Sequence, residues 1–96
     1  MPHPILQTSA LALALMATAA SAQSVRTEQN ISLDLANQIA AHTVAACAAN
    51  GDAVTATVVD RAGTVRAVQR ADNAGPHTLE ASRLKAYTSA SAKNTT

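Results

Sequence analysis

The chain of 96 residues is poor in cysteine and in aromatic side chains, with one cysteine, one tyrosine and no phenylalanine or tryptophan. The single cysteine, Cys47, excludes an internal disulfide and any metal or redox motif that needs two thiols. We expect this thiol to be a small buried apolar group. Many of the apolar residues are alanines. Alanine buries little area, and each Å² of buried apolar area stabilises the fold by only about 25 cal/mol. The composition therefore predicts a thin core.

An excess of charge of one sign is also lacking. Seven Lys and Arg face six Asp and Glu, the formal net charge is +1, and the charges are scattered. A nucleic-acid or anionic-membrane surface needs clustered basic residues, so neither partner is expected. The sequence has no glycine-rich phosphate loop, no HExxH or GxSxG motif, and no two histidines four residues apart. No motif therefore indicates a nucleotide site, a zinc protease or a serine hydrolase.

The N-terminus has the order of an export signal. Residues 10–20 (ALALALMATAA) form a short apolar run, and residues 20–22 (ASA) offer the small side chains that signal peptidase accepts. We predict a signal peptide over residues 1–22 and a periplasmic or secreted mature chain. The run is shorter than the roughly 20 apolar residues that span a bilayer, so no membrane partner is expected after cleavage. The alternative is a buried N-terminal helix, because no Lys or Arg precedes the run.

The mature part begins with a polar segment, residues 23–31, which predicts a flexible lead-in. A helix is predicted over residues 33–49, because Ser32 is a good N-cap and Asn50-Gly51 tolerates the positive φ of a helix end. One stripe of this helix recurs at helical spacing and is expected to face the core. The stripe consists of Leu35, Ile39, His42 and Ala46.

Two strands and a second helix follow. Residues 53–59 (AVTATVV) and 64–70 (TVRAVQR) are rich in β-branched residues and alternate between two faces, so they predict an antiparallel hairpin. Asp60 and Gly63 suit the two ends of its turn, and Asp60 is expected to bond only to its own backbone there. Residues 71–76 predict a loop, and residues 79–92 predict a helix with Thr78 as its N-cap.

The order helix, strand, strand, helix leaves a sheet incomplete. Two strands alone are marginal in water, and an unpaired edge invites association. We therefore expect the chain to be a truncated piece of a larger domain.

Several short segments carry a more specific signal through their order and spacing. They are Val58-Val59-Asp60, Gly63, Arg70, Ala71-Asp72, Gly75-Pro76-His77-Thr78 and Lys85-Ala86-Tyr87-Thr88. Over nearly all of residues 31–91 the chain resembles the first half of the GlcG/HbpS family, and the GPHT segment is similar to its exported haem-binding branch. The resemblance implies an α/β (α+β) domain with an antiparallel five-stranded sheet flanked by helices, of which residues 32–96 form the helix–hairpin–helix part. It also implies haem as the cofactor and a homo-oligomer.

His77 is the first candidate for a haem-iron or metal ligand. It follows Gly-Pro at the mouth of the second helix, where loops commonly present functional groups, and a neutral imidazole is a good ligand for haem iron. Thr78 beside it belongs to the same set of haem contacts. The alternative is a histidine at a helix end that caps backbone groups or meets solvent.

The remaining candidates share an ability to contact a second part of a haem. They are His42, Arg83, Tyr87 and Thr88, with Arg70 and Lys85 beside them. Arginine forms bidentate contacts with carboxylates such as haem propionates, and Tyr87 and Thr88 can donate hydrogen bonds. The alternatives are structural: a core position for His42 or Tyr87, and a surface position or a pair with Asp72 for Arg70.

Three functions are compatible with these residues. The leading hypothesis is an exported haem-binding protein that captures, buffers or senses haem. An enzyme that degrades haem or is linked to glycolate use is the second, although no acid–base pair stands out. The third is a structural subunit whose alanine-rich helices pack in an oligomer without catalysis.

Overall fold

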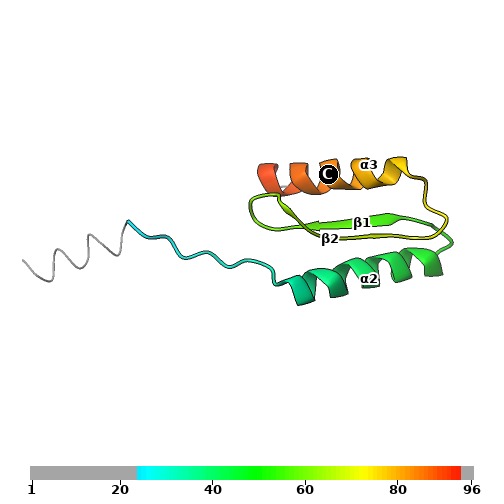
Figure 1. Ribbon diagram of the computed structural model, residues 1–96, viewed down its shortest axis with the longest axis horizontal. Coiled ribbons are helices and arrows are strands. Elements are labelled where there is room, and N and C mark those ends of the chain that lie inside the picture. The colour runs from blue at the N-terminus through cyan, green and yellow to red at the C-terminus, as the bar shows by residue number, and fades with distance from the viewer. Residues whose placement is uncertain (1–23, 94–96) are drawn as a thin grey trace, which may run out of the picture.

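The computed structural model describes residues 24–93, which fold into two helices and two strands in the predicted order (Figure 1). They are α2 (Leu33–Ala49), β1 (Thr55–Val59), β2 (Val65–Arg70) and α3 (His77–Ala92). The predicted α+β class and the helix–hairpin–helix order are confirmed. The predicted signal peptide lies outside the described residues. Within residues 24–93 no helix combines the length and the apolar character that crossing a membrane requires.

α2 begins and ends where the local signals predict. The Ser32 hydroxyl oxygen accepts a hydrogen bond from the Leu35 N–H at 3.1 Å, which satisfies one donor of the first turn. At the other end Gly51 has a φ of 87°, and its N–H donates to the Ala48 carbonyl at 3.0 Å. Glycine adopts this left-handed conformation without strain, so the chain leaves the helix here.

β1 and β2 form an antiparallel pair in which Thr55 faces Arg70 and Val58 faces Ala67. The register shifts after Val58, so β2 carries an extra residue there and the hairpin bends. Both strands begin slightly later than predicted, within the usual latitude of element ends.

The turn between the strands is held by one carboxylate. Asp60 Oδ1 accepts hydrogen bonds from the N–H groups of Ala62 and Thr64, each at 3.0 Å. The Gly63 N–H donates to the Asp60 carbonyl at 2.9 Å, and Gly63 has a φ of 81°. The expected role of Asp60 as a turn residue is confirmed.

The hairpin is the middle layer of three, with one helix on each face (Figure 1). α2 packs on the face that carries Ala56, Val58 and Ala67. On the opposite face the hydroxyls of Thr55 and Thr57 lie 2.6 Å from hydroxyls on α3. One face of the sheet is therefore apolar and the other is joined to its helix by polar contacts.

The core between α2 and the hairpin is built from alanine. Ala36 and Ala40 are fully buried, and they meet Ala56 and Ala67, each 8% exposed. None of the described residues larger than alanine is fully buried. The predicted thin core is confirmed, whereas Cys47, which was expected to be buried, is only half-buried.

The prediction that this stripe of α2 faces the core is wrong. Leu35 is 47% exposed, Ile39 is 41% exposed, and His42 is exposed as well. α2 instead turns Ala36 and Ala40 toward the sheet. Alanines occur on most sides of this helix, so the spacing of its residues could not identify the buried face. The strand face opposite carries small residues, and close packing against it favours the smallest side chains of the helix.

α3 begins at His77, earlier than predicted, because Pro76 has a φ of −62° and adopts helical geometry. The predicted N-cap role of Thr78 is wrong, since its hydroxyl donates to the Gly75 carbonyl at 2.6 Å instead. At the far end Lys93 has a φ of 54°, which makes it the one non-glycine residue in the left-handed region within residues 24–93.

Candidate functional site

Most of the candidate ligands lie on α3: His77, Thr78, Arg83, Lys85, Tyr87 and Thr88. Arg70 lies at the end of β2. His42 lies on α2, across the hairpin (Figure 1). The two histidines therefore lie on opposite faces of the hairpin and do not come together within one chain.

His77 is exposed at the first residue of α3. A Cβ at Gly75 would come within 2.7 Å of its imidazole Cε1 and 2.8 Å of Nδ1, so the ring lies directly against the glycine backbone. Within residues 24–93 the imidazole has no hydrogen bond or ion pair. Nε2 lies farther from Gly75, 4.0 Å from that Cβ position, so it is the ring nitrogen better placed for an external partner, and the glycine before the helix makes room for the ring.

One exposed face of α3 forms a stripe of residues, called here the outer stripe. His77, Ala81, Leu84 and Thr88 recur at intervals of four, three and four residues, which places them on one helix face. All are exposed, and Leu84 is 48% exposed. Leu84 was missed as a candidate, although its spacing of seven from His77 was visible in the sequence. The stripe offers an imidazole, an apolar surface and a hydroxyl.

Thr78 faces inward, in contrast to His77. Its hydroxyl lies 2.6 Å from the Thr55 hydroxyl and donates to the Gly75 carbonyl at 2.6 Å. Because its proton is committed to Gly75, the Thr78 oxygen accepts from Thr55. This side chain therefore fastens α3 to β1 and is not directed toward a ligand beside His77.

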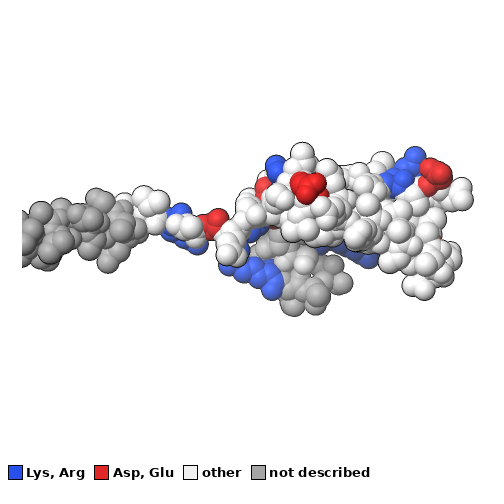
Figure 2. All heavy atoms as spheres, turned by 90° about the horizontal axis from the view of Figure 1, so that it is seen from below, with Lys and Arg blue, Asp and Glu red and all other residues white. Residues whose placement is uncertain are grey.

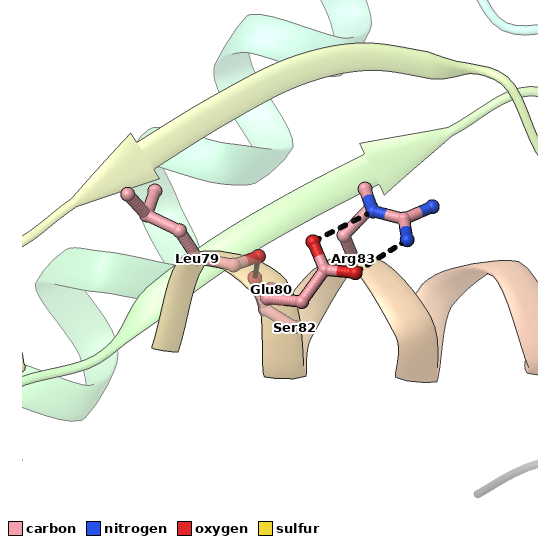
Figure 3. Close-up of polar contacts among 4 residues, drawn as sticks. All are labelled: Leu79, Glu80, Ser82 and Arg83. Carbon is pink, nitrogen blue, oxygen red and sulfur yellow. Dashed lines mark hydrogen bonds and ion pairs between the residues drawn. The ribbon is translucent and has the colours of Figure 1, made fainter. Parts of the chain in front are cut away.

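Arg83 is held by Glu80 on the same helix (Figure 3). Its Nε donates to one carboxylate oxygen at 3.1 Å and its Nη2 to the other at 2.5 Å, a bidentate pair. The hydrogen bond from Arg83 lowers the pKa of Glu80 below its ordinary value of 4.5 and raises that of Arg83. A propionate would have to displace Glu80, whereas exposed Lys85 has no ion pair within residues 24–93.

Tyr87 is 49% exposed and does not fill the core, contrary to the structural alternative. Its ring lies over the hairpin turn, where a Cβ at Gly63 would be 2.8 Å from the ring Cδ2. The phenol also raises the pKa of nearby Arg83. Tyr87 thus joins the C-terminal half of α3 to the turn, about ten helix steps or ~15 Å along the axis from His77.

Arg70, the candidate on β2, has a hydrogen-bond partner within the chain. Arg70 is exposed and donates from Nη1 to the Ala74 carbonyl at 2.7 Å. The expected surface position is therefore confirmed, whereas Arg70 forms no ion pair with Asp72 within residues 24–93. No three His, Cys, Asp or Glu side chains of residues 24–93 are grouped closely enough to hold a metal ion.

A hollow in the described surface lies elsewhere, at the opposite end of α3. It has a volume of about 580 Å³ and lies between the lead-in segment, the hairpin turn and the end of α3. Its lining consists of Arg26, Glu28, Asn30, Arg61, Ala62, Ser89, Ala90 and Lys93. It contains none of the predicted haem contacts, so the hollow and the outer stripe are two separate features.

Comparison with known proteins adds one finding. The model of the HbpS-like family, described as haem degrading protein HbpS-like, matches residues 31–96. The match includes both helices and both strands. No curated protein matches the chain significantly. Since well over half of the 96 residues are matched, the resemblance is confirmed at the level of the family, which ties the chain to haem-related proteins. The chain belongs to the HbpS-like family.

Proposed function

We propose that this chain is an exported haem-binding protein that captures, buffers or senses haem, with His77 as the iron ligand. The observation that carries the proposal is the open imidazole of His77, exposed at the start of α3 in a chain of a haem-related family. Neutral imidazole is a common axial ligand of haem iron. Export rests on the signal-like order of residues 1–22.

The residues around His77 fit a haem on the outer stripe of α3. Leu84 gives apolar contact, and Lys85 gives a cation for a propionate without first breaking an ion pair. Thr88 adds a hydroxyl at the far end of the stripe. Bound haem supplies the iron centre, while these side chains orient the macrocycle and hold its carboxylates. Arg83 and Tyr87 lie along a neighbouring side of the helix and would act at the margin of the site.

A single helix face covers one side of a flat ligand, so the proposal includes a homo-oligomer. Nine large apolar side chains of residues 24–93 are between 41% and 71% exposed. Exposed apolar side chains mark a site of association where they form a contiguous patch. Analytical ultracentrifugation should find assemblies larger than one chain, and a strict monomer at high concentration would remove this part of the proposal.

The test of haem binding is a hemin titration followed by absorbance. We expect a saturable Soret shift with the wild-type chain. His77→Ala should weaken binding by at least about tenfold, the lower end of the loss seen when even an outer-shell partner of a metal ligand is removed. His42→Ala is the matched control, because this histidine is also exposed but lies across the hairpin. Equal effects of the two variants, or no Soret shift at all, would overturn the assignment.

The family description also names haem degradation, and the same sample can separate that function from binding. With a reductant and oxygen, a binding protein retains its Soret band. Loss of the band, with release of iron and an open-chain product, would favour the enzyme. Persistence of that turnover in His77→Ala would place the reaction away from His77.

A further inference from the structure

The hollow at the end of α3 has an unusual charge. Three of its lining residues are basic, Arg26, Arg61 and Lys93, and one is acidic, Glu28. The chain as a whole has a net charge of only +1, so a local excess of basic groups is a property of this place and not of the composition. In Figure 2 basic side chains lie where the lead-in segment meets the layered body, while most of that face is uncharged.

The basic side chains of this hollow differ in whether an acidic side chain of the same chain already pairs with them. Arg26 pairs with Glu28 at 3.3 Å between two well-exposed side chains, a contact of the kind that contributes little stability. Arg61 and Lys93 have no ion pair within residues 24–93. Two cations are therefore left for an external anion, and a third is held only by a weak surface pair.

Neutral donors complete the lining. Asn30 Oδ1 accepts from the backbone N–H groups of Ile31 and Arg61, each at 3.1 Å. This fixes the amide and leaves its NH₂ group as a donor. The half-buried Ser89 hydroxyl also borders the hollow. Amide, hydroxyl, guanidinium and ammonium donors from three segments thus surround one space of about 580 Å³, within the size range of small-molecule sites.

The backbone at Lys93 is a second, independent observation. Its φ of 54° lies in the left-handed region, where helices usually place glycine. A lysine there costs stability relative to glycine, the residue that usually ends a helix in this conformation. A lysine that ends α3 in this way adds a cation where the negative end of the helix dipole would otherwise repel an anion.

We infer that this hollow binds a small dianion that carries carboxylate or phosphate groups, with Arg61 and Lys93 as the principal cations. Asn30 and Ser89 donate hydrogen bonds to the same ligand. Glu28 opposes binding, because it occupies Arg26 and adds a negative charge. The site is separate from the outer stripe: Ser89 lies twelve residues from His77, or about 18 Å along the helix. The inference does not depend on haem binding.

Calorimetric titration of the purified chain with succinate and with inorganic phosphate tests the site. Arg61→Gln should weaken binding by about tenfold, as expected for a lost hydrogen bond to a charged group. Arg66→Gln is the matched control, because this exposed arginine lies on β2 outside the hollow. Glu28→Gln should strengthen binding. Absence of binding by both anions, or equal losses in the two arginine variants, would overturn the inference.

Lys93→Gly separates a ligand role from a structural one. Glycine relieves the left-handed backbone, so the variant should resist urea better than the wild type while it binds succinate more weakly. Gain of stability with unchanged anion affinity would remove Lys93 from the site and refute its assigned role.

A hemin titration distinguishes two possible sources of the carboxylate, a free dianion and a haem propionate. If the site takes a free dianion, Arg61→Gln leaves the Soret titration unchanged and succinate does not compete with hemin. If a haem propionate is the ligand, Arg61→Gln weakens hemin, and hemin dimethyl ester binds the wild type no better than the variant. Either result supports a carboxylate site at Arg61, and only the ligand differs. Failure of His77→Ala to affect hemin would leave this inference intact.

Discussion

Gly63 is the position where one added methyl group should report the contact between α3 and the hairpin turn. We predict that Gly63→Ala destabilises the chain through two effects. Its φ of 81° is strained for any residue with a Cβ. The new Cβ would also come within 2.8 Å of Tyr87 Cδ2 and 3.2 Å of Cε2, closer than carbon atoms tolerate, so the ring must shift.

The two effects can be separated by a second glycine. Gly51 has a φ of 87°, and a Cβ there would meet nothing within 4 Å, so Gly51→Ala carries the backbone cost alone. That cost is about 1–2 kcal/mol. Displacing the half-exposed Tyr87 ring adds about 1 kcal/mol, the lower end of overpacking costs. Gly63→Ala should therefore melt about 4–8 °C below Gly51→Ala, since that is the shift per kcal/mol for a domain of this size.

The assay is urea and thermal unfolding followed by far-UV circular dichroism. A double-mutant cycle with Tyr87→Ala isolates the ring contact, because Gly63→Ala should cost less once the ring is absent. Equal losses in the Gly51 and Gly63 variants would refute the reasoning. A zero coupling energy in the cycle would also show that Tyr87 does not pack on the turn.

Two further predictions concern the helices. Ser32→Ala removes the acceptor for the Leu35 N–H and should cost about 1 kcal/mol in urea unfolding, whereas Ser32→Asp should retain the cap. For Glu80, the Arg83 hydrogen bond lowers the folded pKa below 4.5. This pair therefore stabilises α3 above that ordinary pKa and is lost as the pH falls through the folded value. Circular dichroism should show helix loss on acidification that is smaller in Glu80→Gln, and identical acid profiles would contradict the pairing.

The ends of the elements were predictable because their signals are local. Ser32 caps α2 with its own hydroxyl, and Asp60 and Gly63 build the turn within five residues of sequence. Each interaction depends on neighbours in the chain and on no tertiary partner. The start of α3 was misplaced for a related reason: proline was treated as loop, although its fixed φ also suits the first turn of a helix.

The packed faces could not be predicted equally well. In α2, leucine and isoleucine at helical spacing suggested a core stripe, yet the buried residues are Ala36 and Ala40. The deciding factor is tertiary: the strand face that α2 meets carries Ala56 and Ala67, so the closest approach favours alanine. Nothing in the spacing of α2 itself contains that information, which is why the core position considered as an alternative for His42 is wrong.

The candidate haem site was predictable in part. The sequence indicated His77 and the helix that carries it, but treated Thr78 as its companion in the site. The inward turn of Thr78 depends on its hydroxyl contact with Thr55, a residue 23 positions away. The pairing of Glu80 with Arg83 follows from their spacing of three residues and was available from the sequence. The basic hollow joins segments that are distant in the chain, so no local pattern could indicate it.

The alanine core also shapes how stability depends on temperature. The heat capacity of unfolding grows with the apolar area that becomes exposed, and its size sets the curvature of the stability curve. A core of Ala36, Ala40, Ala56 and Ala67 exposes little such area. The curve of an isolated chain should be shallow and its melting broad. Assembly that covers Leu35, Ile39 or Leu84, each more than 40% exposed, would increase the curvature and narrow the melting transition. Calorimetry would register such assembly as a larger heat-capacity change of unfolding per chain.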